Sequence, residues 1–140
     1  MATQRLSKVA ALEKIPLFEG LSKTDLEKVS RLMEEIAVPA GHRVATTGES
    51  GRELFIIVDG RARVTTRRGR TTHLGPGDSF GEISLIDGEP RSADVDAVTA
   101  MRLLVIGYRE FWQLLDDHLS IVRKIVRALA RRLREAERPV

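Results

Sequence analysis

The sequence predicts an α+β fold that is mainly β: a small antiparallel roll or sandwich flanked by N-terminal helices and two C-terminal helices, for which we favour a jelly-roll-like β-roll (a double-stranded β-helix). Two observations lead to this prediction. Apolar residues recur with helical spacing in residues 7–36 and 108–138 but alternate within residues 37–106. Nine of the 11 glycines lie in that alternating segment, as expected for short strands joined by tight turns. At 140 residues, the whole chain 1–140 is expected to form a single domain.

The N-terminal segment, residues 7–36, is predicted to be helical. A short helix over residues 7–14 ends before Pro16. A second helix begins at Ser22, because Ser22 and Asp25 have the spacing of a capping box. Helical spacing of the apolar residues then predicts that this helix continues as far as Ile36, through Leu26, Val29, Leu32, Met33 and Ile36.

Residues 37–106 are predicted to form the β-roll. A buried strand is expected over residues 54–58, and Asp59-Gly60 predicts a two-residue hairpin whose returning strand contains Val64. A second hairpin tip is expected at residues 67–70, and a further turn at residues 75–78. Two closing strands follow from the alternation of Val95, Ala97, Met101, Leu103 and Val105.

Residues 108–138 are predicted to form two helices. Phe111 and Leu115 mark the first helix, and Asp116 or Asp117 is expected to cap the second. In the second helix, apolar residues follow spacings of three and four like the seam of a coiled coil: Leu119, Val122, Val126, Leu129, Leu133 and Ala136. We expect a homodimer through this seam, the alternative being that the stripe packs back on its own roll.

Composition limits the classes of function. The net charge is +3, and residues 120–140 hold seven Lys or Arg against two Glu, which we interpret as the solvated face of a dimer helix rather than a nucleic-acid or membrane surface. There is no cysteine, which excludes disulfides and thiolate metal sites. The N-terminus has no apolar signal region, and no run reaches the roughly 18 apolar residues of a membrane span. A soluble, cytoplasmic protein is expected.

Residues 80–93, with the sequence Phe-Gly-Glu-Ile-Ser-Leu-Ile-Asp-Gly-Glu-Pro-Arg-Ser-Ala, contain the groups that would hold one small anion. Gly81 lets the backbone pass close to a ligand, and a helix beginning at Glu82 would point free N–H groups at it. Arg91 offers a planar, permanently charged fork that matches two phosphate oxygens. Glu82 is an acceptor suited to a ribose hydroxyl.

At these residues the sequence resembles the cyclic-nucleotide-binding domain family, whose phosphate-binding cassette reads Phe-Gly-Glu, a short helix, then Pro-Arg and a small residue. The resemblance covers about residues 15–138. Ser84 stands where the family often has Ala or Gly, and Asp94 where it often has Thr or Ser. The resemblance implies that phosphate and ribose are bound by Gly81, Glu82, Ile83, Ser84, Arg91 and Ser92. It also implies tentative base contacts from Val64 and Thr72, and from Leu129 and Leu133 of the last helix.

The function implied is a non-catalytic sensor of a 3′,5′-cyclic purine nucleotide, which relays binding through its last helix to an unidentified protein effector. We favour cyclic AMP (cAMP) over cyclic GMP (cGMP). The adenine-reading hydroxyls of the catabolite activator type are replaced by Ala136 and Glu137, while Ser92 could contact guanine. One alternative is the excised sensor of a Crp/Fnr-type regulator, whose helix-turn-helix domain would begin where this chain ends. Another is an interaction module with a vestigial pocket.

An enzyme is not expected. Small β-rolls of the cupin kind hold a metal through a His-x-His pair, but His42, His73 and His118 are scattered along this sequence. A Gly-x-Ser-x-Gly elbow and a phosphate-binding Walker loop are also absent from the sequence. We therefore expect no metal and no cofactor, with the cyclic nucleotide as ligand and nucleic acid as partner only through an additional output domain.

Overall fold

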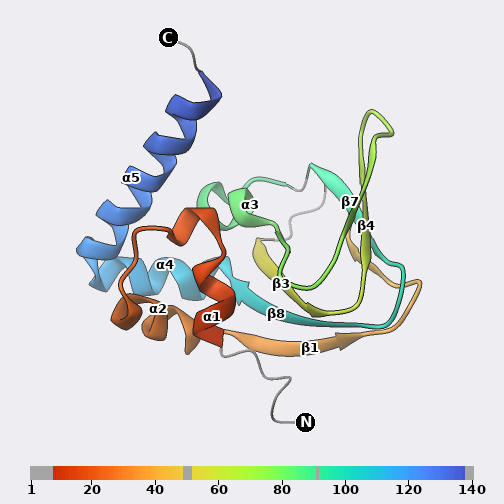
Figure 1. Ribbon diagram of the computed structural model, residues 1–140, viewed down its shortest axis with the longest axis horizontal. Coiled ribbons are helices and arrows are strands. Elements are labelled where there is room, and N and C mark those ends of the chain that lie inside the picture. Colours follow the sequence, from red (N-terminus) through yellow and green to blue (C-terminus); the bar gives the residue numbers. More distant parts are fainter. Residues whose placement is uncertain (1–7, 49–51, 91, 138–140) are drawn as a thin grey trace. The chain divides into compact units, whose positions relative to one another are not determined.

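The computed structural model of the protein describes residues 8–48, 52–90 and 92–137 (Figure 1). The chain divides into two compact units. A helical unit contains the residues up to Leu32 and those from Phe111 onward, and a β unit runs from Met33 to Glu110. Within the described residues, no helix combines the length and the apolar character needed to cross a bilayer.

In the residues that the structure describes, the β unit consists of two antiparallel sheets of four strands each. The first sheet has the order β1 (Glu34–Val38), β8 (Met101–Gly107), β3 (Glu53–Asp59) and β6 (Ser79–Phe80). The second has the order β2 (Arg43–Ala45), β7 (Ala93–Ala97), β4 (Ala62–Thr66) and β5 (Thr71–Leu74). The predicted fold class, an antiparallel β-roll with flanking helices, is confirmed.

Alternate residues of both sheets form the core of the β unit. Because side chains of a strand point to opposite faces in turn, the first sheet contributes Phe55 and Ile57 from β3 and Leu103 from β8. The second sheet contributes Val95 and Ala97 from β7 to the same buried cluster. Along β7, Asp94 and Asp96 alternate with these two apolar residues. The side chains of Asp94 and Asp96 therefore lie on the opposite face of the strand from the buried cluster.

One predicted hairpin is wrong and one is confirmed. Asp59-Gly60 does join β3 to β4, but these strands belong to different sheets, so the chain crosses between layers instead of pairing with itself. Gly60 makes this sharp turn with φ at 94°. The hairpin tip predicted at residues 67–70 is present, because β4 pairs with β5 from Ala62↔Leu74 to Thr65↔Thr71. The turn predicted at residues 75–78 is also present.

The helical unit contains α1 (Lys8–Glu13), the short 3-10 helix η2 (Pro16–Phe18), α2 (Lys23–Ser30), α5 (Leu119–Ala136) and α4 (Tyr108–Asp117) from Phe111 onward. The capping box is confirmed: Asp25 N–H donates to Ser22 Oγ at 3.1 Å, and Ser22 N–H donates to Asp25 Oδ2 at 3.0 Å. Phe18 and Phe111 meet in the core of this unit, with ring centroids 5.9 Å apart.

Two helix boundaries differ from the prediction. The helix beginning at Ser22 ends at Ser30 rather than Ile36, because residues 34–38 pair with β8 along their whole length. Strand pairing overrides the helical spacing of a few apolar residues there. Neither Asp116 nor Asp117 caps α5: α4 continues through Asp117, and the N-cap is His118, which makes no side-chain capping bond.

Helix α5 begins at Leu119 and ends at Ala136, the first and last residues of the predicted apolar seam, and it carries two apolar faces. Ile121, Ile125 and Ala128 are buried, a face that the seam prediction did not include. The seam positions Leu119, Val126 and Leu133 are 62%, 57% and 60% exposed, respectively. These three residues are spaced seven apart, as in one row of a heptad repeat. These three seam positions are therefore distinct from the face that packs within the protomer, whereas the seam positions Val122 and Leu129 are half-buried.

Asp25 joins α2 to α5 inside the helical unit. Its carboxylate is buried, and Oδ2 also accepts a hydrogen bond from Lys124 Nζ at 2.7 Å. Burial alone raises the pKa of the Asp25 carboxyl, but the hydrogen bonds from Lys124 and Ser22 outweigh burial and hold the pKa below its ordinary value. Ionised Asp25 therefore stabilises the fold above the ordinary pKa, and this contribution is lost as the pH falls through the lowered pKa.

We expect Asp25→Asn to lower the free energy of unfolding by about 1–3 kcal/mol at pH 7, because the amide cannot form the ionic hydrogen bond to Lys124. Urea unfolding of both proteins at a series of pH values measures this difference. It should stay constant from neutral pH down to about 5 and shrink below about 3.9, the ordinary pKa of aspartate. A difference that persists unchanged at the lowest pH would show that the carboxylate charge is not what stabilises the fold.

Candidate functional site

A cavity of about 300 Å³ lies within the β unit, beside the short helix α3 (Glu82–Asp87). Its volume is at the lower end of the range of small-molecule sites. The lining residues come from β2, β4, β6, α3 and β7 with its preceding segment: Ala45, Val64, Ser79, Phe80, Gly81, Glu82, Ile83, Ser84, Ser92, Ala93 and Val95. Six of the predicted site residues, Gly81, Glu82, Ile83, Ser84, Ser92 and Val64, are therefore brought together.

The start of α3 forms one wall of the cavity. Gly81 is the N-cap residue, with φ at 86°, a conformation that favours glycine. The first bond of the helix runs from Leu85 N–H to Gly81 O at 3.1 Å, and the Leu85 side chain is fully buried, which anchors the helix. The N–H groups of the first turn of a helix point out of its N-terminal end, and this end of α3 lines the cavity.

Both ends of α3 are held by packing in the β unit. Before the helix, the Phe80 ring stacks on Phe55, with centroids 4.9 Å apart and an angle of 15° between the planes. After the helix, Glu89 N–H donates to Asp87 Oδ1 at 2.9 Å, and a Cβ added at Gly88 would come within 3.2 Å of the Tyr108 ring. The segments on both sides of α3 are thus packed within the β unit.

The lining combines hydroxyl groups and one carboxylate with apolar side chains. Ser79, Ser84 and Ser92 supply hydroxyls, and Glu82 is the only carboxylate among the described lining residues. Ala45, Val64 and Val95 come from strands and make the facing part of the cavity apolar. A ligand with a polar, hydroxylated end and a flat apolar end matches this distribution of groups.

Asp94, which replaces the hydroxyl residue common in the family cassette, does not line the cavity. Thr47 N–H donates to Asp94 Oδ1 at 2.7 Å, and Arg43 Nη1 lies 3.5 Å from Oδ2. The hydrogen bonds from Thr47, with the nearby guanidinium of Arg43, hold the pKa of Asp94 below its ordinary value. The Asp94 carboxylate therefore stays ionised. Its polar contacts are with Thr47 and with Arg43 of β2 rather than with groups that line the cavity.

Four predicted site residues are not placed in the cavity. Arg91 lies outside the described residues. Thr72 lies directly opposite Val64 in the β4–β5 ladder, so both residues share one sheet face, but Thr72 is not a lining residue. Leu129 and Leu133 lie on α5, in the helical unit. The roles of all four residues stay predictions.

Sequence reasoning missed several lining residues, among them Ala45, Ser79, Ala93 and Val95. The alternation of β7 could have indicated Ala93 and Val95, because they share one face of the strand. Ala45 lies on a strand of three residues that no sequence pattern marked. Among the described residues, no group of His, Asp and Glu side chains is arranged to hold a metal ion.

The model of the cyclic nucleotide-binding domain family matches residues 35–118. The chain is 30% identical over 128 residues to the CRP-like cAMP-activated global transcriptional regulator of Mycobacterium tuberculosis, covering 88% of this chain and 57% of that protein. It is 34% identical over 113 residues to the cAMP-dependent protein kinase regulatory subunit of Eremothecium gossypii, covering 80% and 25%. The chain thus spans little more than half of the first relative and a quarter of the second.

Among solved structures, the crystal structure of the N-terminal domain of a transcriptional regulator from Streptomyces coelicolor A3(2) superimposes with a TM-score of 0.81. The sequence identity is 29%, and the match covers 93% of this chain and 96% of that domain. The sequence match, the relatives and the fold agree with the resemblance seen in the cassette. The chain belongs to the cyclic nucleotide-binding domain family.

Proposed function

We propose that the protein is a non-catalytic sensor that binds a 3′,5′-cyclic purine nucleotide, cAMP in preference to cGMP. The observation that carries this proposal is the cavity of about 300 Å³ in which Glu82, Ser84 and Ser92 face apolar strand residues. Arg91 directly precedes Ser92 in the sequence, which supports its assignment to the ligand phosphate. The two relatives named for cAMP add support.

Each part of the cavity has a proposed role. The guanidinium of Arg91 would bind the cyclic phosphate from one side. The backbone N–H groups of the first turn of α3 would bind it from the other side. Glu82 would accept a hydrogen bond from the ribose 2′-hydroxyl. Val64 and Val95 would lie against the base, with Thr72 close by. Leu129 and Leu133 of α5 would cover the base from the helical unit.

The preference for cAMP rests on the absence of a strong reader for guanine. Ser92 lines the cavity and is the proposed partner of a guanine amino group, but a single hydroxyl contributes only about 1–3 kcal/mol. We therefore expect cAMP to bind more tightly than cGMP, with a ratio under roughly 100-fold. Paired titrations of wild type and Ser92→Ala measure the ratio. A preference for cGMP that disappears in Ser92→Ala would reverse the proposed order.

We propose that binding is relayed through α5 to a partner, and that α5 pairs with a second copy of the chain. The exposed row Leu119, Val126 and Leu133 supports the pairing, because a separate face of α5 already packs within the protomer. Closure of α5 over the base would couple nucleotide binding to the position of this helix. Hydrogen exchange of the α5 amides should therefore slow when cAMP binds, and unchanged exchange would contradict the relay.

Val126→Glu should convert the dimer to a monomer at tens of micromolar protein, because it places two like charges in the seam. Val126 is 57% exposed, so the substitution should leave the fold of the protomer intact. Sedimentation velocity measures the change, and Arg127→Glu, at the neighbouring exposed position outside the seam, is the matched control. Wild type that is monomeric with and without cAMP would contradict the dimer.

A second candidate is the sensing part of a Crp/Fnr-type transcription regulator. The 96% coverage of the Streptomyces coelicolor N-terminal domain favours this reading. Antibodies raised against this chain would test it in cells of the source organism. A native protein substantially larger than 15.6 kDa would support the regulator, and one of about that mass would support a self-contained sensor.

A further inference from the structure

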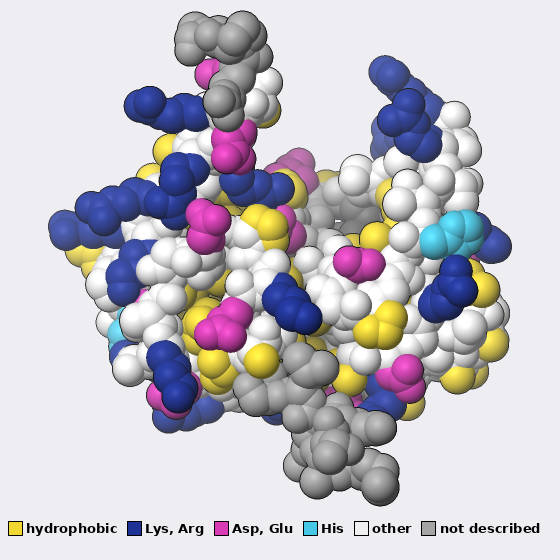
Figure 2. All heavy atoms as spheres, viewed as in Figure 1, with side chains coloured by type: hydrophobic (Ala, Val, Ile, Leu, Met, Phe, Trp, Pro, Cys, Tyr) yellow, Lys and Arg dark blue, Asp and Glu magenta, His cyan; other side chains and the backbone are white. Residues whose placement is uncertain are grey.

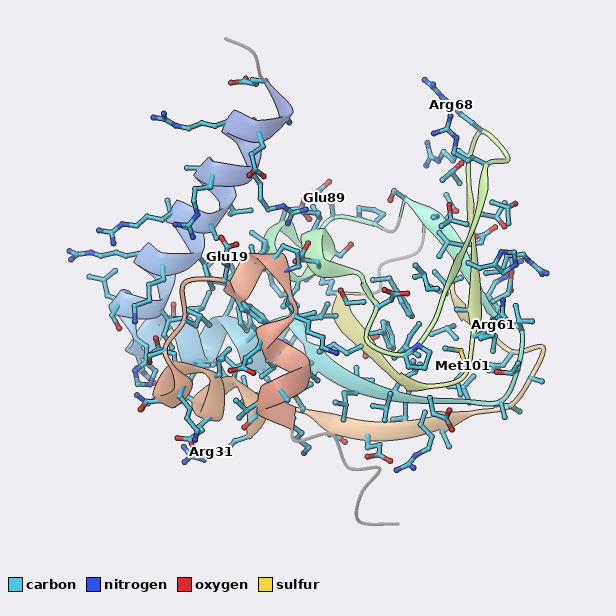
Figure 3. The ribbon with its side chains drawn as sticks, viewed as in Figure 1. Glu19, Arg31, Arg61, Arg68, Glu89 and Met101 are labelled. Atoms are coloured by element: carbon cyan, nitrogen blue, oxygen red, sulfur yellow. The ribbon has the colours of Figure 1, made fainter. Side chains whose placement is uncertain are left out.

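The β4–β5 hairpin carries a concentrated positive charge at its tip. Its tip residues Arg67, Arg68 and Arg70 are all exposed, and the sequence contains no Asp or Glu between residues 60 and 77. The hairpin extends beyond the other strands of the β unit, with Lys and Arg side chains gathered at its end (Figure 2) and Arg68 pointing away from the sheets (Figure 3). We call these three residues the arginine tip.

The arginine tip differs from the arginines on the strands of the same sheet. Arg43 Nε lies 2.8 Å from Asp96 Oδ1, and Arg63 Nη2 lies 3.9 Å from Asp96 Oδ2. Within the described parts of the chain, the three guanidinium groups of the arginine tip form no ion pair. Three cations of like charge are thus held together without a counter-charge, which favours binding of an anionic partner.

The backbone of the arginine tip is well fixed. Thr66 N–H donates to Arg70 O at 2.9 Å, and Arg70 N–H donates to Thr66 Oγ1 at 3.1 Å. Gly69 completes the turn with φ at 81°. A partner would therefore meet guanidinium groups that project from an ordered turn, which lowers the entropy cost of binding them.

A hollow of about 870 Å³ separates the arginine tip from the segment that follows α3, where Glu89, Pro90 and Ser92 line the opposite side. No aromatic side chain is among the described lining residues, so nucleotide bases would find no stacking partner there. Glu89 would also repel a chain that is uniformly anionic. A peptide, which can place an acidic residue on one side and a neutral or basic residue on the other, suits the hollow better.

The neighbouring edge of the sheet is open. In the described residues β5 pairs only with β4, and its first three residues are exposed. The hydrogen bond between Thr66 and Arg70 sets the alternation of the antiparallel ladder, so Thr72 and Leu74 direct their backbone groups toward β4. Thr71 and His73 then direct their N–H and C=O groups outward, where an added strand could pair with them.

We infer that an extended, acidic segment of a partner protein adds as a strand to the β5 edge and places Asp or Glu side chains on the arginine tip. Charges beside a strand edge also discourage pairing with neutral strands, so the arginine tip would select an acidic segment. This docking goes beyond the proposed function, because it needs no bound nucleotide. The hollow shares Ser92 with the nucleotide cavity, but neither the arginine tip nor the β5 edge lines that cavity.

Fluorescence anisotropy tests the inference with a labelled 12-residue peptide in which Glu alternates with Val and Thr. We expect saturable binding to the full chain at low salt that weakens at higher salt, since the Debye length falls below about 10 Å above 0.1 M. The triple variant R67S/R68S/R70S should bind at least about tenfold more weakly. The control R31S/R109S/R123S removes three exposed arginines elsewhere and should change affinity less than about twofold.

Two further variants test the strand edge separately from the charge. His73→Pro removes one outward N–H from an edge strand, a position where proline is tolerated, and should abolish binding of the peptide. His73→Val keeps that N–H and should bind like wild type. Three results would overturn the inference: equal loss in the control triple variant, equal binding of a peptide with Lys in place of Glu, or tighter binding of oligo(dT) or phosphatidylglycerol vesicles than of the acidic peptide.

Discussion

Arg91→Leu should weaken cAMP binding by about 30-fold to several thousandfold, because loss of one partner of a desolvated charge pair costs roughly 2–5 kcal/mol. The guanidinium is the proposed counter-charge of the cyclic phosphate, and no leucine atom can donate a hydrogen bond to it. Isothermal titration calorimetry with cAMP measures the loss directly. The thermal midpoint of the unliganded protein should change little, because the proposed role of Arg91 is toward the ligand.

Two variants control this result. Arg91→Lys keeps the charge but not the planar fork, and should give an intermediate affinity. Arg61→Leu removes an exposed arginine that does not line the cavity and should leave affinity unchanged. If Arg91→Leu binds cAMP within about threefold of wild type, the phosphate is held elsewhere, since threefold corresponds to well under 1 kcal/mol.

Gly60→Ala should destabilise the fold by about 3 kcal/mol or more. Gly60 has φ at 94°, and a Cβ there would lie 2.9 Å from Met101 Cα and closer still to the Ala100 carbonyl oxygen. Both neighbours are backbone atoms at the start of β8, so neither can move aside as a flexible side chain would. Denaturant unfolding, with the slope m compared between proteins, measures the cost.

Gly69→Ala is the matched control for this substitution. Gly69 also has positive φ, at 81°, but an added Cβ would meet nothing within 4 Å. It should cost only the conformational strain of the left-handed region, about 1–2 kcal/mol. Equal costs for the two substitutions would mean that the close approach of β8 to the turn contributes nothing.

Elements defined by neighbouring residues could be predicted from the sequence. The capping box at Ser22 and Asp25 depends on groups three residues apart, and the presence of α5 within residues 108–138 follows from its own apolar spacing. The short helix predicted to begin at Glu82 is likewise present, because the residues that form it are contiguous in the sequence. In each case the sequence close by contains the hydrogen-bonding partners or the repeating pattern that decides the structure.

Features that depend on distant pairing could not be predicted. Asp59-Gly60 signals a turn, but only the pairing of β3 with β8 and of β4 with β7 decides that the turn crosses between sheets. The apolar spacing through Ile36 fits a helix, yet Ile36 pairs with Leu103, far along the chain. The second apolar face of α5 was missed because its burial depends on packing against other helices rather than on a pattern within α5.

The residues that line the cavity also divide into those that could be predicted from neighbouring sequence and those that could not. The wall formed by residues 81–84 was predicted because these residues are adjacent in the sequence. The facing wall was predicted only at Val64, since Ala45 and Val95 reach the cavity through the order β2-β7-β4 of the second sheet. That order follows from long-range strand pairing, which residue spacing within one segment does not encode.

Titration of the purified protein with cAMP and, separately, with 5′-AMP tests the central claim most directly. Both ligands carry adenine and ribose, but only cAMP has the singly charged cyclic phosphate that the cassette is proposed to hold. We predict saturable binding of one cAMP per chain by calorimetry, with 5′-AMP at least about 100-fold weaker. Failure of both cAMP and cGMP to bind at about millimolar concentration, a free energy of only about −4 kcal/mol, would indicate a vestigial pocket, and equal binding of 5′-AMP would contradict recognition of a cyclic nucleotide.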